Sequence, residues 1–173
     1  QGQELGENAA GAMGFSGDDG RTSIFDYCSI PTLVRWYNNG NCGIQKLNNK
    51  ERKIRAFYKK VLRLCNGEKA IFEGAFFDLM YVNYHNLNPN KQYLYLRHYE
   101  NETLLIAVNF DSQDATVYAD IPQHAFDFLK IDSGTYFMKD LISGKQKTVE
   151  FSSNAKFELH IPAHNGVVWK IVK

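Results

Sequence analysis

The chain has 173 residues, of which 44% are apolar and 23% charged, and its formal net charge is +1. This length and composition are typical of one globular domain, or of one domain with a piece of another, and exclude a disordered or fibrous protein. The near-neutral charge gives no electrostatic footprint for nucleic acid or an anionic membrane. No run approaches the roughly 18 apolar residues of a membrane span, so neither kind of partner is expected.

The cysteines and the first residues of the chain give no indication of a disulfide, a metal site or a signal peptide. Cys28, Cys42 and Cys65 form no CxxC pair, and we expect free, buried thiols rather than a disulfide. No group of residues has the spacing of a metal site, so we expect no metal and no cofactor. No basic segment followed by an apolar stretch opens the chain, so no signal peptide is predicted and the compartment stays open.

The first third of the chain predicts a loop followed by helices. Residues 9–21 hold four glycines without apolar periodicity, which is typical of a long irregular loop. Ile30-Pro31 can open a short helix to about Asn38, because proline is tolerated in a first turn. A longer helix begins at Asn48, which forms a capping-box-like pair with Glu51, and ends at Gly67. Its apolar residues recur at three- and four-residue steps: Ile54, Phe57, Tyr58, Val61, Leu62 and Cys65.

The opposite face of this longer helix is basic. It is either a docking face for a partner or a solvated helix surface, and the pattern favours the solvated surface. The apolar face needs a partner surface, which a glycine-rich loop does not provide. The helix therefore packs on the sheet that follows or on sequence outside this chain. The basic residues are Lys50, Arg52, Lys53, Lys59, Lys60 and Arg63.

After residue 67 the sequence is β in character. Short runs with alternating or continuous apolar residues are separated by turn signals such as Asn101-Glu102 and Ser143-Gly144. Such regular spacing predicts a β-sandwich or barrel. We expect one or two strands within residues 71–84, a short helix at 123–129, and strands at 93–100, 103–110, 116–121, 136–141, 146–151, 156–161 and 166–172.

No convincing catalytic constellation occurs. The sequence lacks the motifs of nucleophile elbows, phosphate loops and helical zinc sites. Asp18-Asp19 is the only tight acidic pair, and adjacent residues in a glycine-rich loop point in different directions. A solvated turn is the preferred interpretation, with a substrate- or cation-contacting loop as the alternative. A Cys–His dyad with Cys65 or Cys28 is disfavoured, because both look like apolar-face residues.

The aromatic residues give a weaker indication of ligand binding. Tyr93, Tyr95 and Tyr99 share one strand face, where such rows stack on sugar rings or pack as core and cross-strand pairs. Packing is the preferred interpretation. The Asn-rich segment from Tyr81 to Tyr93 is expected to be an exposed loop whose amides could hydrogen-bond a glycan, although turn chemistry alone explains its composition.

The order of these segments resembles the α-amylase family, the family 13 glycoside hydrolases. GQELGE at residues 2–7 looks like the stretch after the eighth barrel strand, and DDGRTSIFDY at 18–27 resembles the loop before the last barrel helix of bacterial members. The residues from Arg55 to Asn66 look like that helix. The run from Glu68 to Gly74 is similar to the passage into the C-terminal domain. YLYLRHYENETLLIAVNF, KDLISGK and IPAHNGVVWKI resemble strands and a hairpin of that domain.

The resemblance implies a (β/α)8 barrel with its active site at the strands' C-terminal ends, followed by a Greek-key β-sandwich. It also implies retaining hydrolysis of α-glucans by an Asp nucleophile, a Glu acid/base and a stabilising Asp. None of the family's sequence motifs around these three catalytic residues occurs in this chain, so no residue here is assigned a catalytic role. The loop with Asp18, Asp19 and Arg21 follows a barrel strand in the family and is the candidate substrate-cleft loop.

We therefore expect a mainly β chain. Residues 1–66 would be the tail of the barrel, with a loop and one or two helices, and 67–173 an antiparallel Greek-key sandwich. Its expected role is non-catalytic, covering and stabilising the upstream catalytic barrel of a starch- or maltodextrin-degrading bacterial enzyme. The alternative is a stand-alone carbohydrate-binding module that uses the tyrosine row for α-glucan. An isolated chain with an exposed barrel-facing surface is expected to dimerise.

Overall fold

The computed structural model describes residues 2–7, 30–153 and 155–173. The chain forms two compact units, residues 1–63 and 64–173, and the division falls inside helix α2 (Asn49–Gly67). The candidate cleft-loop residues Asp18, Asp19 and Arg21 lie outside the described residues, as does Cys28. No helix in the described ranges is both long and apolar enough to cross a membrane.

The first unit consists of short helical segments. They are the 3-10 turns η1 (Gln3–Leu5) and η2 (Asn38–Gly40), helix α1 (Pro31–Tyr37) and the start of α2. The predicted capping box is confirmed. Asn48 Oδ1 accepts the Glu51 backbone N–H at 2.9 Å, and the Glu51 carboxylate accepts the Asn48 backbone N–H at 3.0 Å. The same carboxylate binds the Arg35 guanidinium of α1, which ties the two helices of this unit together.

The apolar stripe of α2 is only partly covered. Glu51 is the single buried residue among the described residues of this helix, and Phe57 and Leu62 are 40% and 59% exposed. The other four residues of the stripe are half-buried: Ile54, Tyr58, Val61 and Cys65. The six basic side chains of the opposite face are exposed. The helix thus forms where the periodicity predicts it, and part of its apolar face is open to solvent.

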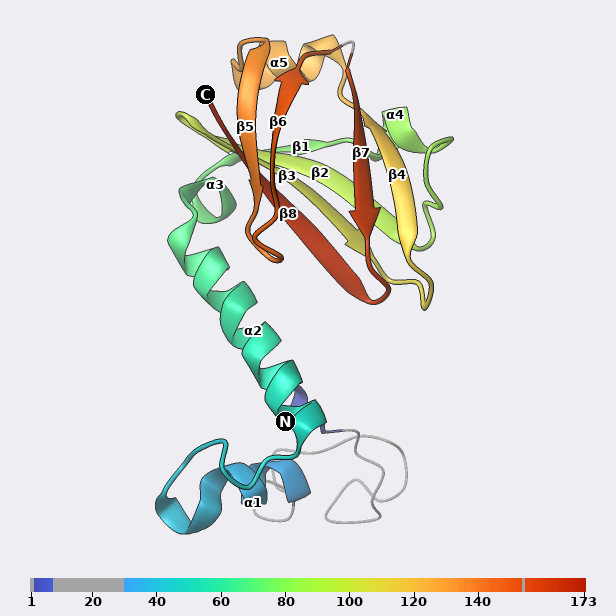
Figure 1. The fold of residues 1–173 in the computed structure, drawn as a ribbon. Helices are drawn as coiled ribbons and strands as arrows, with labels where there is room; N and C mark the ends of the chain where they lie inside the picture. The colour runs from blue at the N-terminus through green and yellow to red at the C-terminus, as the bar shows by residue number, and fades with distance from the viewer. Residues whose placement is uncertain (1, 8–29, 154) are drawn as a thin grey trace. The chain divides into compact units, whose positions relative to one another are not determined.

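The second unit is an antiparallel β-sandwich (Figure 1). One sheet has six strands in the order β1-β2-β3-β8-β5-β6, and the other pairs β4 with β7. The chain leaves the large sheet for β4, returns to it for β5 and β6, leaves it again for β7 and ends in it with β8, which lies between β3 and β5. The strands are β1 (Ala75–Asp78), β2 (Gln92–Tyr99), β3 (Glu102–Asn109), β4 (Ala115–Asp120), β5 (Gly134–Asp140), β6 (Gln146–Phe151), β7 (Lys156–Ile161) and β8 (Asn165–Val172).

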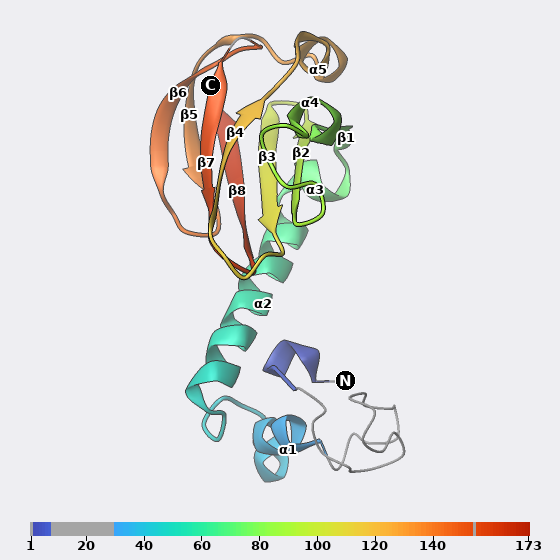
Figure 2. The ribbon, with the colours of Figure 1, turned by 90° about the vertical axis from the view of Figure 1, so that its right-hand side faces the viewer.

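The sandwich core collects alternate residues of the strands. Leu94 and Leu96 of β2 and Leu105 of β3 face the smaller sheet, whose Val117 and Leu159 face back. Helix α5 (Gln123–Leu129) lies over one end of the sandwich in both ribbon views and buries Ala125, Phe126 and Leu129 (Figure 2). The predicted mainly β sandwich, preceded by helices, is confirmed.

A buried carboxylate holds the β5–β6 hairpin. Asp140 is 1% exposed and accepts backbone N–H groups from Ile142, Ser143 and Val168. The turn residue Gly144 has φ +81°, which favours glycine, and confirms the predicted Ser143-Gly144 turn. The hydrogen bond to Val168 joins this hairpin to β8, so one side chain fixes both a turn and a strand contact.

The expectation of one or two strands within residues 71–84 is confirmed by the single strand β1, which lies between two short helices, α3 (Lys69–Phe72) and α4 (Met80–Asn83). The two helices were not expected, because short apolar runs cannot be assigned by periodicity.

The structure corrects two other local expectations. The first hairpin turns at Glu100-Asn101, since Tyr99 pairs with Glu102. Of the cysteines expected to be buried, Cys42 is exposed because it follows the η2 turn, and Cys65 is half-buried because the apolar face of α2 is only partly covered.

Candidate interaction surface

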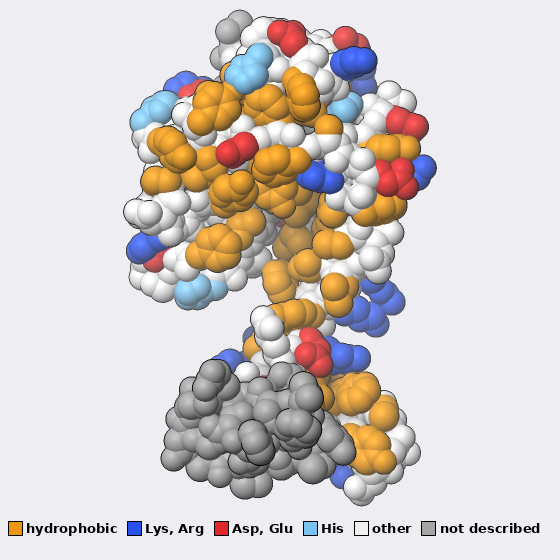
Figure 3. Space-filling view, turned by 180° about the vertical axis from the view of Figure 1, so that it is seen from behind, with side chains coloured by type: hydrophobic (Ala, Val, Ile, Leu, Met, Phe, Trp, Pro, Cys, Tyr) orange, Lys and Arg blue, Asp and Glu red, His pale blue; other side chains and the backbone are white. Residues whose placement is uncertain are grey.

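The outer face of the large sheet is apolar at its centre. Antiparallel pairing places Phe76 opposite Arg97, and Tyr95 opposite Ile106, with Val168 next on β8. Directly paired residues lie on the same face of a sheet, so these side chains form one surface on the side away from the sandwich core. Seen from the side that carries β1 and β2, hydrophobic side chains cover much of the second unit, interrupted by single charged residues (Figure 3).

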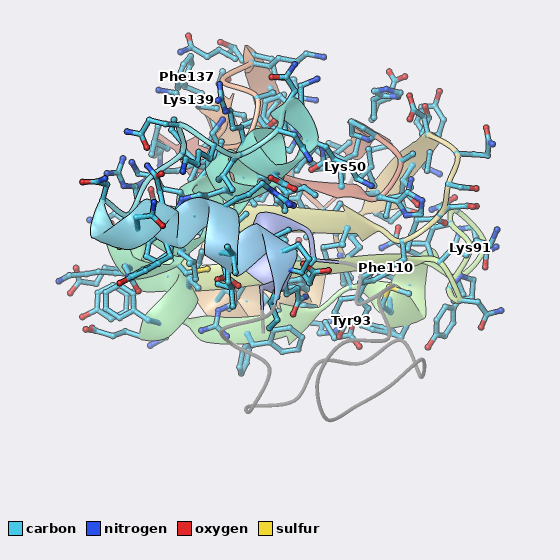
Figure 4. The ribbon with its side chains drawn as sticks, turned by 90° about the horizontal axis from the view of Figure 1, so that it is seen from below. Lys50, Lys91, Tyr93, Phe110, Phe137 and Lys139 are labelled. Atoms are coloured by element: carbon cyan, nitrogen blue, oxygen red, sulfur yellow. The ribbon has the colours of Figure 1, made fainter. Side chains whose placement is uncertain are left out.

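Part of this face is hollowed. The apolar hollow has a volume of about 470 Å³, and Tyr95 lies at its centre, with ring centroids 5.4 Å from Phe76 and 5.6 Å from Tyr93. Phe110, just beyond β3, is 68% exposed at its edge. Tyr93 and Phe110 lie close together, whereas Phe137, on β5 of the same outer face, lies away from them (Figure 4). The hollow is lined by Ile71, Phe76, Tyr93, Tyr95, Arg97, Ile106, Val108 and Phe110.

The predicted tyrosine row is divided by Arg97. The Arg97 guanidinium donates to the carbonyl oxygens of Ala70 at 2.8 Å and Ile71 at 2.6 Å, which fixes α3 over this part of the sheet. Tyr99 lies beyond it, with the Lys69 ammonium 5.4 Å from its ring centroid. Tyr93 and Tyr95 are therefore neighbours on one platform, and Tyr99 belongs to a separate contact with α3.

A second hollow lies beside the first, and we call it the loop hollow. It measures about 440 Å³ and is formed between β1, β2 and the segment that joins α4 to β2. Tyr93 lines both hollows, and Tyr84 is 58% exposed. The lining residues are Asp78, Met80, Tyr84, Pro89, Asn90 and Tyr93.

The asparagines around the loop hollow are mostly committed to the fold. Asn83 is fully buried; its amide donates to Leu79 O and Asp120 O, and its oxygen accepts the Asp120 N–H. Asn86 donates to the Asp120 carboxylate at 2.9 Å, and Asn88 Oδ1 accepts the Asn90 N–H at 3.1 Å. The Asn-rich composition therefore serves mainly to hold the segment in place, as turn chemistry predicts.

The two hollows lack the geometry of glycoside cleavage. That reaction needs two carboxyl groups about 5–10 Å apart, and Asp78 is the one carboxylate that lines either hollow. Among the described residues, no group of three His, Cys, Asp or Glu side chains is arranged to hold a metal ion. Burial raises the pKa of the Tyr95 and Tyr93 hydroxyls, so both are neutral hydrogen-bonding groups at ordinary pH.

The sequence analysis named Tyr93 and Tyr95, and also the segment that contains Tyr84 and Asn90, but it did not single out Phe76 or Phe110. Phe76 stands in an apolar run, and its place opposite Arg97 follows only from the β1–β2 register. Phe110 is the last residue of the strand expected at 103–110. An aromatic residue at the end of a strand, next to a strand that carries tyrosines, is a sequence signal that indicates a shared aromatic surface.

Comparison with known proteins gives matches at the level of structure only. No family model and no curated protein matches the chain. An α-amylase from Anoxybacillus superposes with a TM-score of 0.50 at 17% identity, over 77% of this chain and 25% of that enzyme. The α-amylase of Geobacillus thermoleovorans, solved with acarbose, gives 0.53 at 16% identity, over 75% and 24%. AmyP, solved with maltose, gives 0.58 at 15% identity, over 98% and 30%.

The chain thus spans no more than about a third of the length of these solved enzymes. At such low identity the likeness concerns the fold, and the matched portion contains the sandwich with the helices before it. The resemblance that the sequence motifs carry is confirmed at that level: this chain has the fold of a segment of α-amylase-type glycoside hydrolases.

Proposed function

We propose that this chain is the non-catalytic C-terminal part of an α-amylase-like glycoside hydrolase, and that it stabilises the catalytic barrel. The observation that carries the proposal is the apolar outer face of the large sheet. The neighbours of similar fold include enzymes solved with maltose and acarbose, which supports an α-glucan such as starch or a maltodextrin as the substrate of the parent enzyme.

The outer face is a docking surface rather than ordinary protein surface. A monomer rarely exposes a contiguous group of aromatic side chains without using it, and Phe76, Tyr93 and Phe110 are 45%, 38% and 68% exposed here. Covering such a side chain contributes roughly 1.5–3 kcal/mol. The apolar stripe of α2, with Phe57 and Leu62 exposed, is a second surface that is only partly covered among the described residues. The barrel is the partner we propose for both.

The sequence upstream of Gln1 in the coding frame tests this proposal directly. We expect a (β/α)8 pattern that contains an Asp nucleophile, a Glu acid/base and a second Asp. The present chain by itself should not release sugar from starch or a nitrophenyl maltoside above the blank. An upstream region without that pattern, or hydrolysis by this chain alone, would contradict the proposal.

Docking of the outer face on the barrel can be tested by making one substitution both in the parent enzyme and in this chain alone. Phe110→Asp places a charge at the edge of the apolar hollow, so it should lower the Tm of the parent enzyme by at least about 3 °C. In this chain alone the change should have little effect, because Phe110 is 68% exposed. Tyr118→Asp is the matched control, since Tyr118 is 51% exposed on β4 of the smaller sheet and does not line the hollow. Equal effects of both changes in the parent would exclude this face as the interface.

The second candidate function is a stand-alone carbohydrate-binding module. The adjacent rings of Tyr93 and Tyr95 favour it, because two exposed aromatic rings on a rigid strand can stack on a sugar. Retarded migration in a starch-containing gel that Tyr95→Ala abolishes would support this function. Unretarded migration of the unaltered chain would rule it out.

A further inference from the structure

The loop hollow differs in chemistry from the apolar hollow. Two tyrosine rings, Tyr84 and Tyr93, line it together with the carboxylate of Asp78 and the amide of Asn90. Its volume of about 440 Å³ lies in the range of small-ligand sites. Aromatic surface combined with a few hydrogen-bonding groups is the usual lining of a site that binds and orients an organic ligand.

The polar groups of the loop hollow are available to a ligand. One oxygen of Asp78 accepts the Met80 backbone N–H at 2.9 Å, and the other has no hydrogen-bond partner within the described ranges. The Asn90 side chain and the hydroxyls of Tyr84 and Tyr93 are likewise without partners in that part of the chain. Asp78, Tyr84 and Tyr93 all line this hollow, so their polar groups lie near one another. Burial raises the pKa of Tyr93, and Asp78 and Tyr84 raise it further.

The framework around these groups is already ordered. Asn83 and Asn86 tie the segment before β2 to Asp120 of β4, and Gln92 accepts the Asn88 N–H at 2.8 Å. Gln92 in turn donates to Asn109 of β3 at 2.9 Å. A ligand that enters the hollow therefore does not have to order the loop, and this lowers the entropy cost of binding.

The charge around the loop hollow acts against anionic ligands. Its single charged lining group is the Asp78 carboxylate, which disfavours phosphates and acidic sugars. The nearest lysine in sequence, Lys91, is engaged 2.8 Å from the Asp111 carboxylate. A neutral pyranose offers an apolar ring face for stacking and hydroxyls that both donate and accept, which matches tyrosine rings beside a carboxylate and an amide.

We infer that the loop hollow is an accessory binding site for a neutral oligosaccharide, an α-linked glucan, next to the apolar docking face, with which it shares Tyr93. The ring of Tyr84 would stack on a glucose unit, and Asp78 and Asn90 would hydrogen-bond its hydroxyls. The choice of an α-linked glucan rests on the proposed function, whereas the neutral sugar class rests on the hollow itself. Such a site would hold the polymer close to the parent enzyme without taking part in its cleavage.

Titration of the chain with maltoheptaose, followed by amide chemical shifts in NMR, tests the inference. We expect saturable shifts in residues 84–93 of the unaltered chain. Tyr84→Ala should raise the Kd at least about tenfold, and Asn90→Ala at least about threefold. Tyr84→Phe keeps the ring and should stay within about threefold of the unaltered chain. Tyr118→Ala is the matched control, because Tyr118 is 51% exposed on β4 and should leave the Kd unchanged.

Three results would overturn the inference. They are the absence of saturable shifts, a Kd that Tyr84→Ala does not change, and equal affinity for the β-linked cellohexaose. Sugar binding lost in Tyr95→Ala but kept in Tyr84→Ala would move the ligand to the apolar hollow and support the stand-alone module instead. None of these results affects the Phe110→Asp comparison in the parent enzyme, so the two proposals fail independently.

Discussion

Individual charged residues fix the helical segment α3 to the large sheet. The Lys170 ammonium of β8 lies between the carboxylates of Glu68, at 2.6 Å, and Glu102, at 2.9 Å. The Glu102 carboxylate also accepts the Ala70 backbone N–H at 2.8 Å. Burial opposes ionisation of Glu102, but the Ala70 N–H and Lys170 outweigh it and hold its pKa below the usual value of 4.5.

Protonation of Glu102 should therefore destabilise the second unit. A carboxyl group with a lowered folded-state pKa stabilises the fold above its unfolded pKa, and the contribution is lost as the pH falls through the folded value. We expect urea unfolding to show decreasing stability below about pH 4.5, and Lys170→Met to reduce this decrease. Lys173→Met is the control, because its ion pair with Asp132 is largely exposed. An unchanged acid profile in Lys170→Met would contradict the assignment.

At high pH the same cluster makes stability depend on pH in the opposite direction. Burial lowers the pKa of Lys170, but the Glu68 and Glu102 carboxylates outweigh burial and raise it above 10.5. This contribution is complete below the unfolded pKa and is lost as the pH rises through the folded one. The three-residue cluster thus stabilises the contact between α3 and the sheet over the whole neutral range.

At the scale of elements, the passage from α3 into β1 depends on close backbone contact at Gly74. A Cβ atom at this position would meet the carbonyl oxygens of Ala70 and His98, the latter at 2.7 Å. Backbone atoms cannot move aside as a flexible side chain can. Glycine is needed here for space, which explains why a Gly follows the apolar helix of this segment.

Gly74→Ala should lower the free energy of unfolding by about 1–3 kcal/mol, the usual cost of overpacking. Gly67→Ala is the matched control, since a Cβ there meets nothing within 4 Å and alanine favours a helix by up to about 1 kcal/mol. Urea unfolding of the two variants compares them directly. Equal stability of both variants would show that the segment can relax around an added methyl group.

At the scale of the whole molecule, the exposed outer sheet face should govern association. An isolated chain with uncovered aromatic residues gains free energy by burying them against a second copy. We expect a concentration-dependent dimer in sedimentation equilibrium, weakened by Phe110→Asp and unaffected by Tyr118→Asp on the smaller sheet. A monomer at all concentrations would show that the apolar hollow alone does not drive association.

Much of the fold was predictable because strand and helix patterns are local. Residues 123–129, 146–151 and 156–161 form the elements expected of them, and the Asn48–Glu51 capping box marks the start of α2. The segment from Lys69 to Asn83 was not predictable in detail, because a short apolar run fits a buried helix as well as a strand.

The candidate sites were predictable only in part. Tyr93 and Tyr95 were visible as an alternating row, but Arg97 separates Tyr99 from them through its contacts with α3. Asn90 differs from its neighbours Asn83, Asn86 and Asn88 only in the bonds that the folded loop makes. Sequence cannot rank four similar asparagines, because the contacts of Asn83 and Asn86 with Asp120 of β4 join segments more than thirty residues apart.

The sequence by itself determined the sandwich class, the helices before it and the likeness to amylase-type enzymes, since each rests on local periodicity or on the order of motifs. The tertiary structure decided which aromatic residues share a surface. β8 pairs with β3 more than fifty residues earlier in the chain, and the β1–β2 register places Phe76 beside Tyr95. Those pairings depend on burial of the whole core, which no short segment encodes.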